Sequence, residues 1–333
     1  MIKYNKKYYE KIIKKYNYNK IDQFLCIDKF NAEKNWFCSY NLEEFVDGYK
    51  NNEPCLVIMG IGINGIPHLG TTSQILKAIY LQKCGFDVQI ILGDLDVYGA
   101  RSTSLKKIDK LISKYKAFII ALGFDEKKGE IRNQYDHLEI LRTSFILSHA
   151  IKDADFIEIE EEINELYKTE KVYGGMEYNV KQSISLMFAD FIYPGFIGKY
   201  KHVLVLSGID EHGYVWKSNE IKNQMGIDMT ISGLYSKMLK GINDYPKMSK
   251  SITKSNIALS ISKKELQKLL LQEKFHYDNY ENSFVYQLMM NVSNYDKKYL
   301  EKIKEDCLNK NSKWEKDVKK YIEDLYEICS LWR

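Results

Sequence analysis

The sequence lacks most of the features that mark secreted, membrane-spanning or metal-binding proteins. Its six cysteines form no Cys-x-x-Cys pair, so we expect neither a zinc site nor a redox motif, and we predict no metal site. No segment approaches the roughly 18 consecutive apolar residues of a membrane helix. Residues 1–15, rich in lysine and tyrosine, lack the apolar stretch of a secretory signal. We therefore expect a cytoplasmic protein without a membrane segment.

The chain also lacks a large excess of either positive or negative charge. The chain carries 49 basic and 45 acidic side chains, and its formal net charge is +4. This balance permits an acidic partner such as RNA but does not require one. With 45% hydrophobic and 28% charged residues, the chain can build an ordinary core without disulfide or metal support. At roughly 150 residues per domain, its length of 333 residues predicts two domains.

Apolar runs alternate with helical periodicity over most of the chain. Buried strands are expected at 55–59, 88–92, 202–207 and 229–232, and the segments between them show apolar residues at helical spacing. This alternation predicts an α/β domain with a parallel sheet. Beyond about residue 250 the strands stop and the chain is charged and helical. The expected divisions are an N-terminal helical extension (1–50), an α/β domain (51–255) and a helical C-terminal domain (256–333).

A glycine-rich loop follows the first expected strand. Gly60 and Gly62 would let a nucleotide approach the backbone, and a helix begins just after the loop, where phosphate groups bind in α/β folds. The segment 60–65 also matches the Gly-x-Gly-x-x-Gly fingerprint of dinucleotide-binding proteins. However, Pro67 delays the helix past the third glycine, and no acidic residue ends the second strand. The dinucleotide interpretation is therefore disfavoured, and a purely structural loop remains an alternative.

Two short motifs are suited to holding phosphates. His68-Leu-Gly70-Thr71 places an imidazole at the positive end of a helix, where it can hydrogen-bond a phosphate oxygen. Lys247-Met248-Ser249-Lys250-Ser251 is a cationic loop with interleaved hydroxyl groups, which can stabilise a departing pyrophosphate. As an isolated charge cluster, the second motif could also be a solvated surface loop.

Together, these motifs resemble the two signatures of class I aminoacyl-tRNA synthetases. The second is a full Lys-Met-Ser-Lys-Ser match, and the first is similar to His-Ile-Gly-His. The resemblance implies a Rossmann catalytic domain followed by a helical domain that contacts the tRNA anticodon. It also implies activation of an amino acid by ATP with Mg²⁺, then transfer to tRNA. His68, Lys247 and Lys250 would be the catalytic residues. The implied ATP ligands are Gly60, Gly62, Gly70, Thr71, Gly208, Asp210, Glu211, Met248, Ser249 and Ser251.

Within the class, the chain looks most like the tyrosyl and tryptophanyl branch. Gly208-Ile-Asp210-Glu211 resembles the ribose- and adenine-binding Gly-x-Asp-Gln segment of that branch. Tyr178 and Gln182 are similar to its Tyr-x-x-x-Gln pattern, which holds the α-amino group of the substrate. The branch implies a homodimer formed through an insertion at about 130–185. The implied amino-acid-binding residues are Ile58, Asp94, Tyr178, Gln182 and Ser185.

Four departures from the family pattern bear on the substrate. Thr71 replaces the second histidine, Glu211 replaces the glutamine, and the usual Pro-Ser/Thr-Gly that precedes the first motif reads Ile-Asn-Gly. Ile58 and Ser185 occupy the two positions that bind the phenol in tyrosyl enzymes. A pocket without partners for a phenol should reject tyrosine, so tryptophan is favoured over tyrosine.

Three alternatives stay open at this point. The chain could be a specialised paralogue that activates another amino acid in a biosynthetic pathway. It could be a nucleotidyltransferase of the same superfamily, although such enzymes usually lack a helical tail and the full lysine motif. It could also be a catalytically impaired paralogue that binds RNA.

Overall fold

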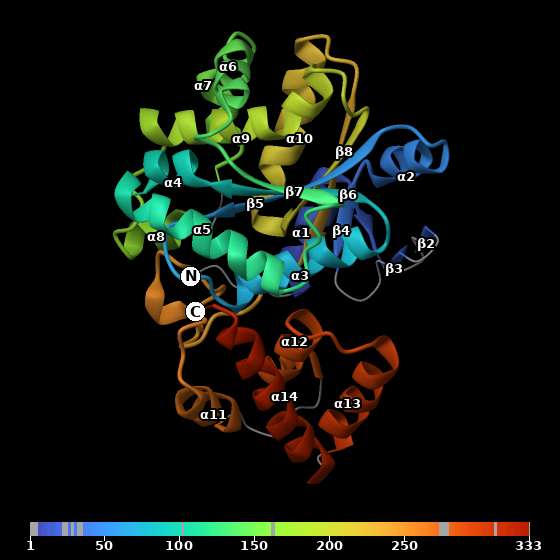
Figure 1. Ribbon diagram of the computed structural model, residues 1–333, viewed down its shortest axis with the longest axis vertical. Coiled ribbons are helices and arrows are strands. Elements are labelled where there is room, and N and C mark those ends of the chain that lie inside the picture. Colours follow the sequence, from blue (N-terminus) through green and yellow to red (C-terminus); the bar gives the residue numbers. More distant parts are fainter. Residues whose placement is uncertain are drawn as a thin grey trace. The chain divides into compact units, whose positions relative to one another are not determined.

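The computed structural model describes residues 6–21, 26–27, 30–31, 36–101, 103–160, 164–272, 280–309 and 312–332, which form two compact units. Unit 1 comprises Met1–Gly65 and Lys77–Met238, and unit 2 comprises Ile66–Leu76 and Leu239–Arg333. Each unit is described here by itself (Figure 1). None of the described helices combines the length and hydropathy needed to cross a membrane.

Unit 1 is built on a seven-stranded sheet with the order β1-β4-β9-β8-β5-β6-β7. The five strands from β9 to β7 are parallel, whereas β4 and β1 extend the sheet in antiparallel orientation. A separate two-stranded ribbon pairs β2 with β3. The strands are β1 (Asn19–Lys20), β2 (Cys26–Ile27), β3 (Phe30–Asn31), β4 (Cys38–Tyr40), β5 (Cys55–Gly62), β6 (Asp87–Gly93), β7 (Gly129–Asn133), β8 (His202–Gly208) and β9 (Thr230–Ser236).

Helices cover both faces of this sheet. α9 and α10 lie on one face, and α5 and the second half of α3 lie on the other (Figure 1). Gly85 and Gly123 follow α3 and α5 with positive φ values of 103° and 106°, the left-handed conformation that ends many helices. The helices of unit 1 are α1 (Lys6–Tyr16), α2 (Leu42–Lys50), α4 (Asp94–Ala100), α5 (Leu105–Ala121), α6 (Leu138–Leu147), α7 (Asp153–Glu158), α8 (Asn164–Thr169), α9 (Tyr178–Phe196), η2 (Ile209–Glu211) and α10 (His212–Gln224); α3 (Leu69–Lys83) begins in unit 2.

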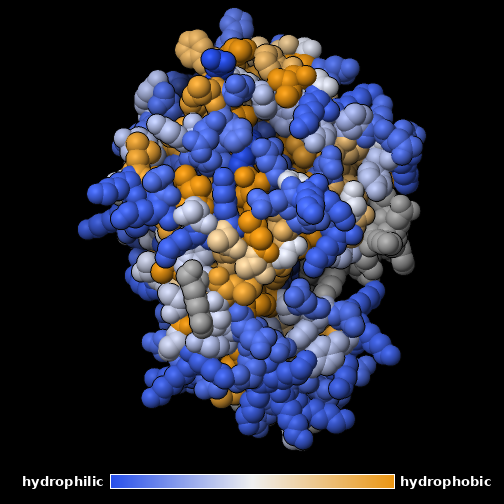
Figure 2. Space-filling model, in the orientation of Figure 1, coloured by the Kyte–Doolittle hydropathy of each residue, from blue (hydrophilic) through white to orange (hydrophobic). Residues whose placement is uncertain are grey.

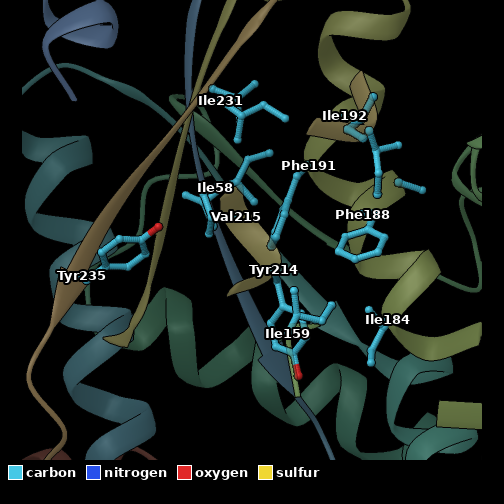
Figure 3. Close-up of a cluster of buried hydrophobic side chains, with 14 of the residues drawn as sticks. Ile58, Ile159, Ile184, Phe188, Phe191, Ile192, Tyr214, Val215, Ile231 and Tyr235 are labelled. Carbon is cyan, nitrogen blue, oxygen red and sulfur yellow. The ribbon is translucent and has the colours of Figure 1, made fainter. Parts of the chain in front are cut away.

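A buried apolar cluster joins the central strands to α9 and α10. Figure 3 shows Ile58 of β5 and Ile231 of β9 facing Phe188 of α9 and Val215 of α10. These four side chains are at most 1% exposed. Burial of one such side chain contributes roughly 1.5–3 kcal/mol, so this cluster is a main source of stability for unit 1.

Unit 2 is helical apart from its connecting loops. Ser262 caps α11 through a capping box with Glu265. Trp314, Val318 and Leu325 form the buried stripe of the last helix, and each is at most 2% exposed. The helices are η3 (Thr253–Ser255), α11 (Lys263–Leu271), η4 (Tyr280–Asn282), α12 (Phe284–Asn291), α13 (Lys297–Asn309) and α14 (Ser312–Ser330).

The predicted α/β fold with a helical C-terminal region is confirmed, with three differences. The N-terminal 50 residues are not only helical, because β1 and β4 join the sheet. The strand β7 was not predicted, because its sequence Gly-Glu-Ile-Arg-Asn carries no apolar run. The division between the units falls after Met238 and not at 255, because the loops on both sides of His68 and of Lys250 pack together in unit 2.

Candidate functional site

The sheet of unit 1 reverses its strand order between β5 and β8. From β5 the chain proceeds outward through β6 and β7, and then returns to the other side of β5 with β8 and β9. In open α/β sheets, ligands bind at the carboxyl ends of the strands beside such a switch point. The segments after β5 and β8 are therefore the candidate nucleotide-binding segments of this unit.

The end of β5 offers an open backbone surface. Gly60 is exposed, and a Cβ atom built on it would have no neighbour within 4 Å. Gly62 is tighter, because a Cβ atom there would lie 3.1 Å from Val97 Cγ2. The buried hydroxyl of Tyr115 donates to the Gly65 carbonyl at 2.8 Å and fixes the end of the loop. A ligand can thus approach the main chain at Gly60 without meeting a side chain.

The end of β8 turns back on itself through Gly208 and Asp210. A Cβ atom at 208 would lie 2.5 Å from Asp210 Oδ1, so this turn requires glycine. Asp210 is 9% exposed, whereas Glu211 projects into solvent. The turn therefore places the Asp210 carboxylate at the carboxyl edge of the sheet, next to the exposed Glu211.

An aromatic group from the N-terminal segment lies against this turn, and no sequence pattern predicted it. Tyr18 Oη and His212 Nδ1 are 2.7 Å apart, and the rings of Tyr16 and His212 meet edge to face with centroids at 4.4 Å. Burial lowers the pKa of His212 to about 4, although Asp210 acts in the opposite direction. His212 is consequently neutral at physiological pH and serves to pack and orient the turn.

The first signature motif forms the N-terminus of α3, in unit 2. His68 precedes the helix and accepts a hydrogen bond at Nδ1 from the Thr71 N–H at 3.3 Å, as an N-cap side chain does. The imidazole lies directly over Gly70, where a Cβ atom would come within 2.9 Å of His68 Cε1. The glycine of the motif is therefore required by the position of the histidine ring.

The hydrogen-bonding state of His68 follows from this geometry. Because Nδ1 accepts a hydrogen bond, the ring proton is on Nε2. Burial lowers the pKa of His68 well below its usual value, and the charges of Lys250 and Lys247 lower it further. His68 is thus a neutral hydrogen-bond donor at physiological pH, and it does not supply a positive charge.

The second signature motif is an ordered loop in the same unit. Met248 and Ser249 are buried, at 5% and 7% exposed, whereas Lys247 and Lys250 on either side are half-buried. The Met248 N–H donates to the Leu239 carbonyl at 3.2 Å. The centre of the loop is thus anchored, and its two ammonium groups lie near His68, whose pKa they lower.

The expected amino-acid-binding residues lie in different surroundings within unit 1. Tyr178 is 75% exposed at the start of α9, and the Gln182 amide donates to its hydroxyl at 3.0 Å. Ser185 donates its hydroxyl to the Lys181 carbonyl of its own helix. Ile58 is fully buried in the apolar cluster. The structure therefore brings Tyr178 and Gln182 together. Ile58 has no polar group to offer, and the Ser185 hydroxyl is already bonded within its own helix.

Asp94 is engaged within the chain. It begins α4, is 2% exposed, and accepts hydrogen bonds from the N–H groups of Leu95 (2.9 Å) and Gln134 (2.8 Å) and from the Asn133 amide (2.9 Å). A carboxylate in the first turn also interacts favourably with the helix dipole. This geometry favours a structural role for Asp94 over the expected contact with a substrate ammonium group.

Next to Asp94 lies a buried ion pair that sequence reasoning missed. Arg132 Nη2 of β7 lies 2.7 Å from Asp190 Oδ1 of α9, and both side chains are 3% exposed. The Gln134 amide donates to the other Asp190 oxygen at 2.7 Å. The available signal was Asp190 itself, a single acidic residue inside the apolar run 186–192.

Among the described residues, no group of three or more His, Cys, Asp or Glu side chains is arranged to hold a metal ion. The ionic groups of the signature motifs are instead cationic, and they suit a polyphosphate.

The arrangement agrees with three comparisons. The sequence profile of a family described as "tRNA synthetases class I (W and Y)" matches residues 50–329. The tryptophan–tRNA ligase 1 of Halobacterium salinarum is 28% identical over 148 residues, 44% of this chain and 26% of that protein. The tryptophan–tRNA ligase of Hyperthermus butylicus is 24% identical over 225 residues, 66% of this chain and 57% of that protein. The matching segments thus span less than two thirds of these relatives.

A solved structure shares the whole architecture. The tryptophanyl-tRNA synthetase of Aeropyrum pernix K1 superimposes with a TM-score of 0.80 at 19% identity, covering 98% of this chain and 92% of that chain. At this identity, the likeness shows the fold.

Proposed function

Because this chain belongs to the class I tRNA synthetase family for tryptophan and tyrosine (W and Y), we propose that it activates an amino acid with ATP and transfers it to tRNA. In the first step, a carboxylate oxygen of the amino acid attacks the α-phosphorus of ATP. The bond to the bridging oxygen breaks, and pyrophosphate leaves. In the second step, a ribose hydroxyl at the tRNA 3′ end attacks the adenylate carbonyl, and AMP leaves.

One observation carries this proposal: unit 2 holds the two signature motifs together. Segment 257–259 pairs with the backbone on both sides of His68, through Leu69 N–H to the Ile257 carbonyl (3.1 Å) and Leu259 N–H to the Pro67 carbonyl (2.9 Å). The loop that carries Lys247 and Lys250 immediately precedes this segment. One neutral donor and two cations therefore face a common region of unit 2, as binding of a triphosphate requires.

Catalysis by these groups would rest on charge stabilisation and positioning. Lys247 and Lys250 would neutralise the negative charge that develops on the leaving pyrophosphate, and His68 would donate from Nε2 to a phosphate oxygen. Mg²⁺ would arrive as the counter-ion of ATP. The remaining residues assigned to ATP are Gly60, Gly62, Gly70, Thr71, Gly208, Asp210, Glu211, Met248, Ser249 and Ser251.

Tryptophan is the first candidate substrate and tyrosine the second. The curated relatives compared above are tryptophan–tRNA ligases. Ile58 offers no polar atom to a phenol, and the Ser185 hydroxyl is already used within its helix. Loss of a hydrogen-bonding partner disfavours a substrate hydroxyl strongly. Tyr178 and Gln182 remain the candidates for the α-amino group.

A paralogue that activates another amino acid is the second candidate function. The observation that favours it is the engagement of Asp94, whose carboxylate already accepts hydrogen bonds from Leu95, Asn133 and Gln134. A substrate ammonium group would have to displace one of these bonds or find another acceptor.

Exposed lysines on α5 support tRNA as the acceptor. Lys106, Lys107, Lys110 and Lys114 are exposed on this helix, and none of them forms an ion pair with a described residue. By contrast, Lys319 of α14 pairs with an acidic residue of its own helix. These lysines outnumber the one acidic residue of the helix, Asp109, and such a row is suited to a phosphate backbone.

An exposed apolar surface on α6 supports a homodimer. Leu138, Leu141 and Phe145 lie along one side of the helix at 56%, 36% and 83% exposed, and Ile157 of α7 is 71% exposed. Apolar side chains appear at this end of unit 1 in Figure 2. Exposed apolar patches mark interaction surfaces, and these residues lie inside the 130–185 region in which the family resemblance implies dimerisation. We place the protein in the cytoplasm, where charging of tRNA takes place.

A charging assay tests the proposal. The purified chain, ATP and tRNA are incubated with labelled tryptophan or tyrosine, and acid-precipitable label is counted. Tryptophan should be attached to tRNA by the wild type. The variant Lys250→Ala should lose about 10²–10³ in rate, whereas Lys240→Ala, at an exposed lysine of the same unit, should remain active. Equal rates for the two variants would remove the loop from the mechanism.

A further inference from the structure

The loop that carries Lys247 and Lys250 is held at its centre by two side chains from outside the motif. The Ser249 N–H donates to Ser255 Oγ at 3.0 Å, and the Asn256 amide donates to the Ser249 carbonyl at 2.6 Å. The Ser255 hydroxyl donates in turn to the Ile252 carbonyl at 2.7 Å. Both backbone groups of Ser249 are thus fixed by the Ser255–Asn256 pair.

The same short segment also holds the first signature motif. Directly after Asn256, Ile257 and Leu259 pair with the backbone around His68 at 3.1 and 2.9 Å. Ser255 is fully buried and Ile257 is 1% exposed, so this attachment point is inside the packed part of unit 2. Segment 255–259 therefore binds the lysine loop with side chains and the histidine turn with its main chain.

We propose that Ser255 and Asn256 are positioning residues for the activation step, because they fix the distance between His68 and the two lysines of the loop. This inference rests on the proposed function, since it assigns a role in ATP binding by the same motifs. Neither side chain needs to touch ATP. Their effect passes through the peptide of Ser249, which lies between Lys247 and Lys250.

The hydrogen bonds that hold Ser249 matter because of the positive charge on the two neighbouring lysines. Two ammonium groups repel each other and gain stabilisation only where phosphate charge develops. A displacement of about 1 Å at a reacting group can cost about 10²-fold in rate. A loop fixed only by its ends would sample such displacements, whereas two hydrogen bonds to its central peptide restrict them.

The test measures amino-acid-dependent exchange of labelled pyrophosphate into ATP. Asn256→Ala should lower kcat by about ten- to a hundredfold and raise the KM for ATP, while the KM for the amino acid stays within about twofold. The matched control is Asn243→Gly, which removes another loop amide, bonded to the Lys254 carbonyl at 2.8 Å. Glycine also tolerates the φ of 54° at that position. The control should exchange at the wild-type rate.

A double-mutant cycle with Lys250→Ala separates positioning from general destabilisation. If Asn256 acts through the lysines, Asn256→Ala should lower the rate by a smaller factor in the Lys250→Ala background than in the wild-type background, because only Lys247 is then left to position. An equal loss in both backgrounds, or no loss in the wild-type background, would overturn the proposal. Ser255→Ala repeats the cycle if Asn256→Ala does not fold.

The activity of the wild type separates failure of the proposed function from failure of the positioning role of Ser255 and Asn256. An inactive wild-type chain would remove the proposed function and this inference with it. An active wild type in which both Asn256→Ala and Ser255→Ala behave like the Asn243→Gly control would overturn this inference alone.

Discussion

The buried pair Arg132–Asp190 gives a prediction whose magnitude follows from the structure. The charged atoms lie 2.7 Å apart, and both side chains are 3% exposed. Arg132→Met keeps most of the apolar volume and removes the charge. Asp190 would then remain buried with only the Gln134 amide as a partner. Burial already raises the pKa of Asp190, and Arg132 is the largest opposing influence.

At pH 7, the loss of unfolding free energy in this variant cannot exceed the free energy needed to protonate Asp190. Starting from an unfolded pKa of about 3.9, protonation at pH 7 costs about 4 kcal/mol, at 1.36 kcal/mol per pH unit. The estimate agrees with the roughly 3–5 kcal/mol observed when one partner of a buried pair is removed. The variant should therefore lose about 4 kcal/mol of unfolding free energy at pH 7.

The sign of the pH dependence is fixed by linkage. In the variant, the folded-state pKa of Asp190 lies above the unfolded value, so the unfolded chain releases its proton first as pH rises. Stability is then lost with rising pH, so the deficit should be smaller at pH 5 than at pH 7.

Urea unfolding at pH 7 and pH 5 measures both quantities. The double variant Arg132→Met/Asp190→Asn buries no charge and leaves an acceptor for the Gln134 amide, so it should return to within about 1 kcal/mol of the wild type. A deficit below about 1 kcal/mol at pH 7, or a double variant no more stable than Arg132→Met, would refute the reasoning.

Three further predictions follow from charge and exposure. Because burial keeps His68 neutral, the pyrophosphate exchange rate should show no titration near pH 6.5, and a fall with that midpoint would contradict the assignment. The wild type should sediment as the proposed dimer and Phe145→Asp as a monomer, since Phe145 is 83% exposed on α6; an unchanged dimer would exclude this face. Lys110→Ala/Lys114→Ala should weaken tRNA binding and reduce the salt slope by about 2, whereas the acid-paired Lys319→Ala should not; an equal effect of Lys319→Ala would argue against α5.

The main strands could be predicted because each contains a continuous run of apolar residues in the sequence. β5 and β8 are continuous apolar runs, as buried parallel strands require. β7 could not be predicted, because its side chains Arg132 and Asn133 bond to residues from α9 and α4. A strand as short as β4, with three residues, also carries too little pattern to be seen in the sequence.

The residues of the candidate site also divide into those that could be predicted from the sequence and those that could not. His68 and the loop from Lys247 to Ser251 are short contiguous motifs, so they could be recognised in the sequence, and their role in binding phosphates stays a prediction. The hydrogen bonds of Asp94 could not, because its partners are Asn133, the last residue of β7, and Gln134 just after it, 39 and 40 residues away. Likewise, the hydrogen bonds from Ser255 and Asn256 to Ser249 depend on the geometry of the loop, which residue spacing in the sequence does not reveal.

Pyrophosphate exchange with each proteinogenic amino acid in turn, without tRNA, is the most direct test of whether this protein forms an aminoacyl adenylate. We expect rapid exchange with tryptophan, little with tyrosine, and loss of exchange in the Lys250→Ala variant. Exchange with a different amino acid would keep the activation chemistry and replace the substrate. No exchange with any amino acid, by a folded chain that binds ATP, would contradict the claim that this protein forms an aminoacyl adenylate.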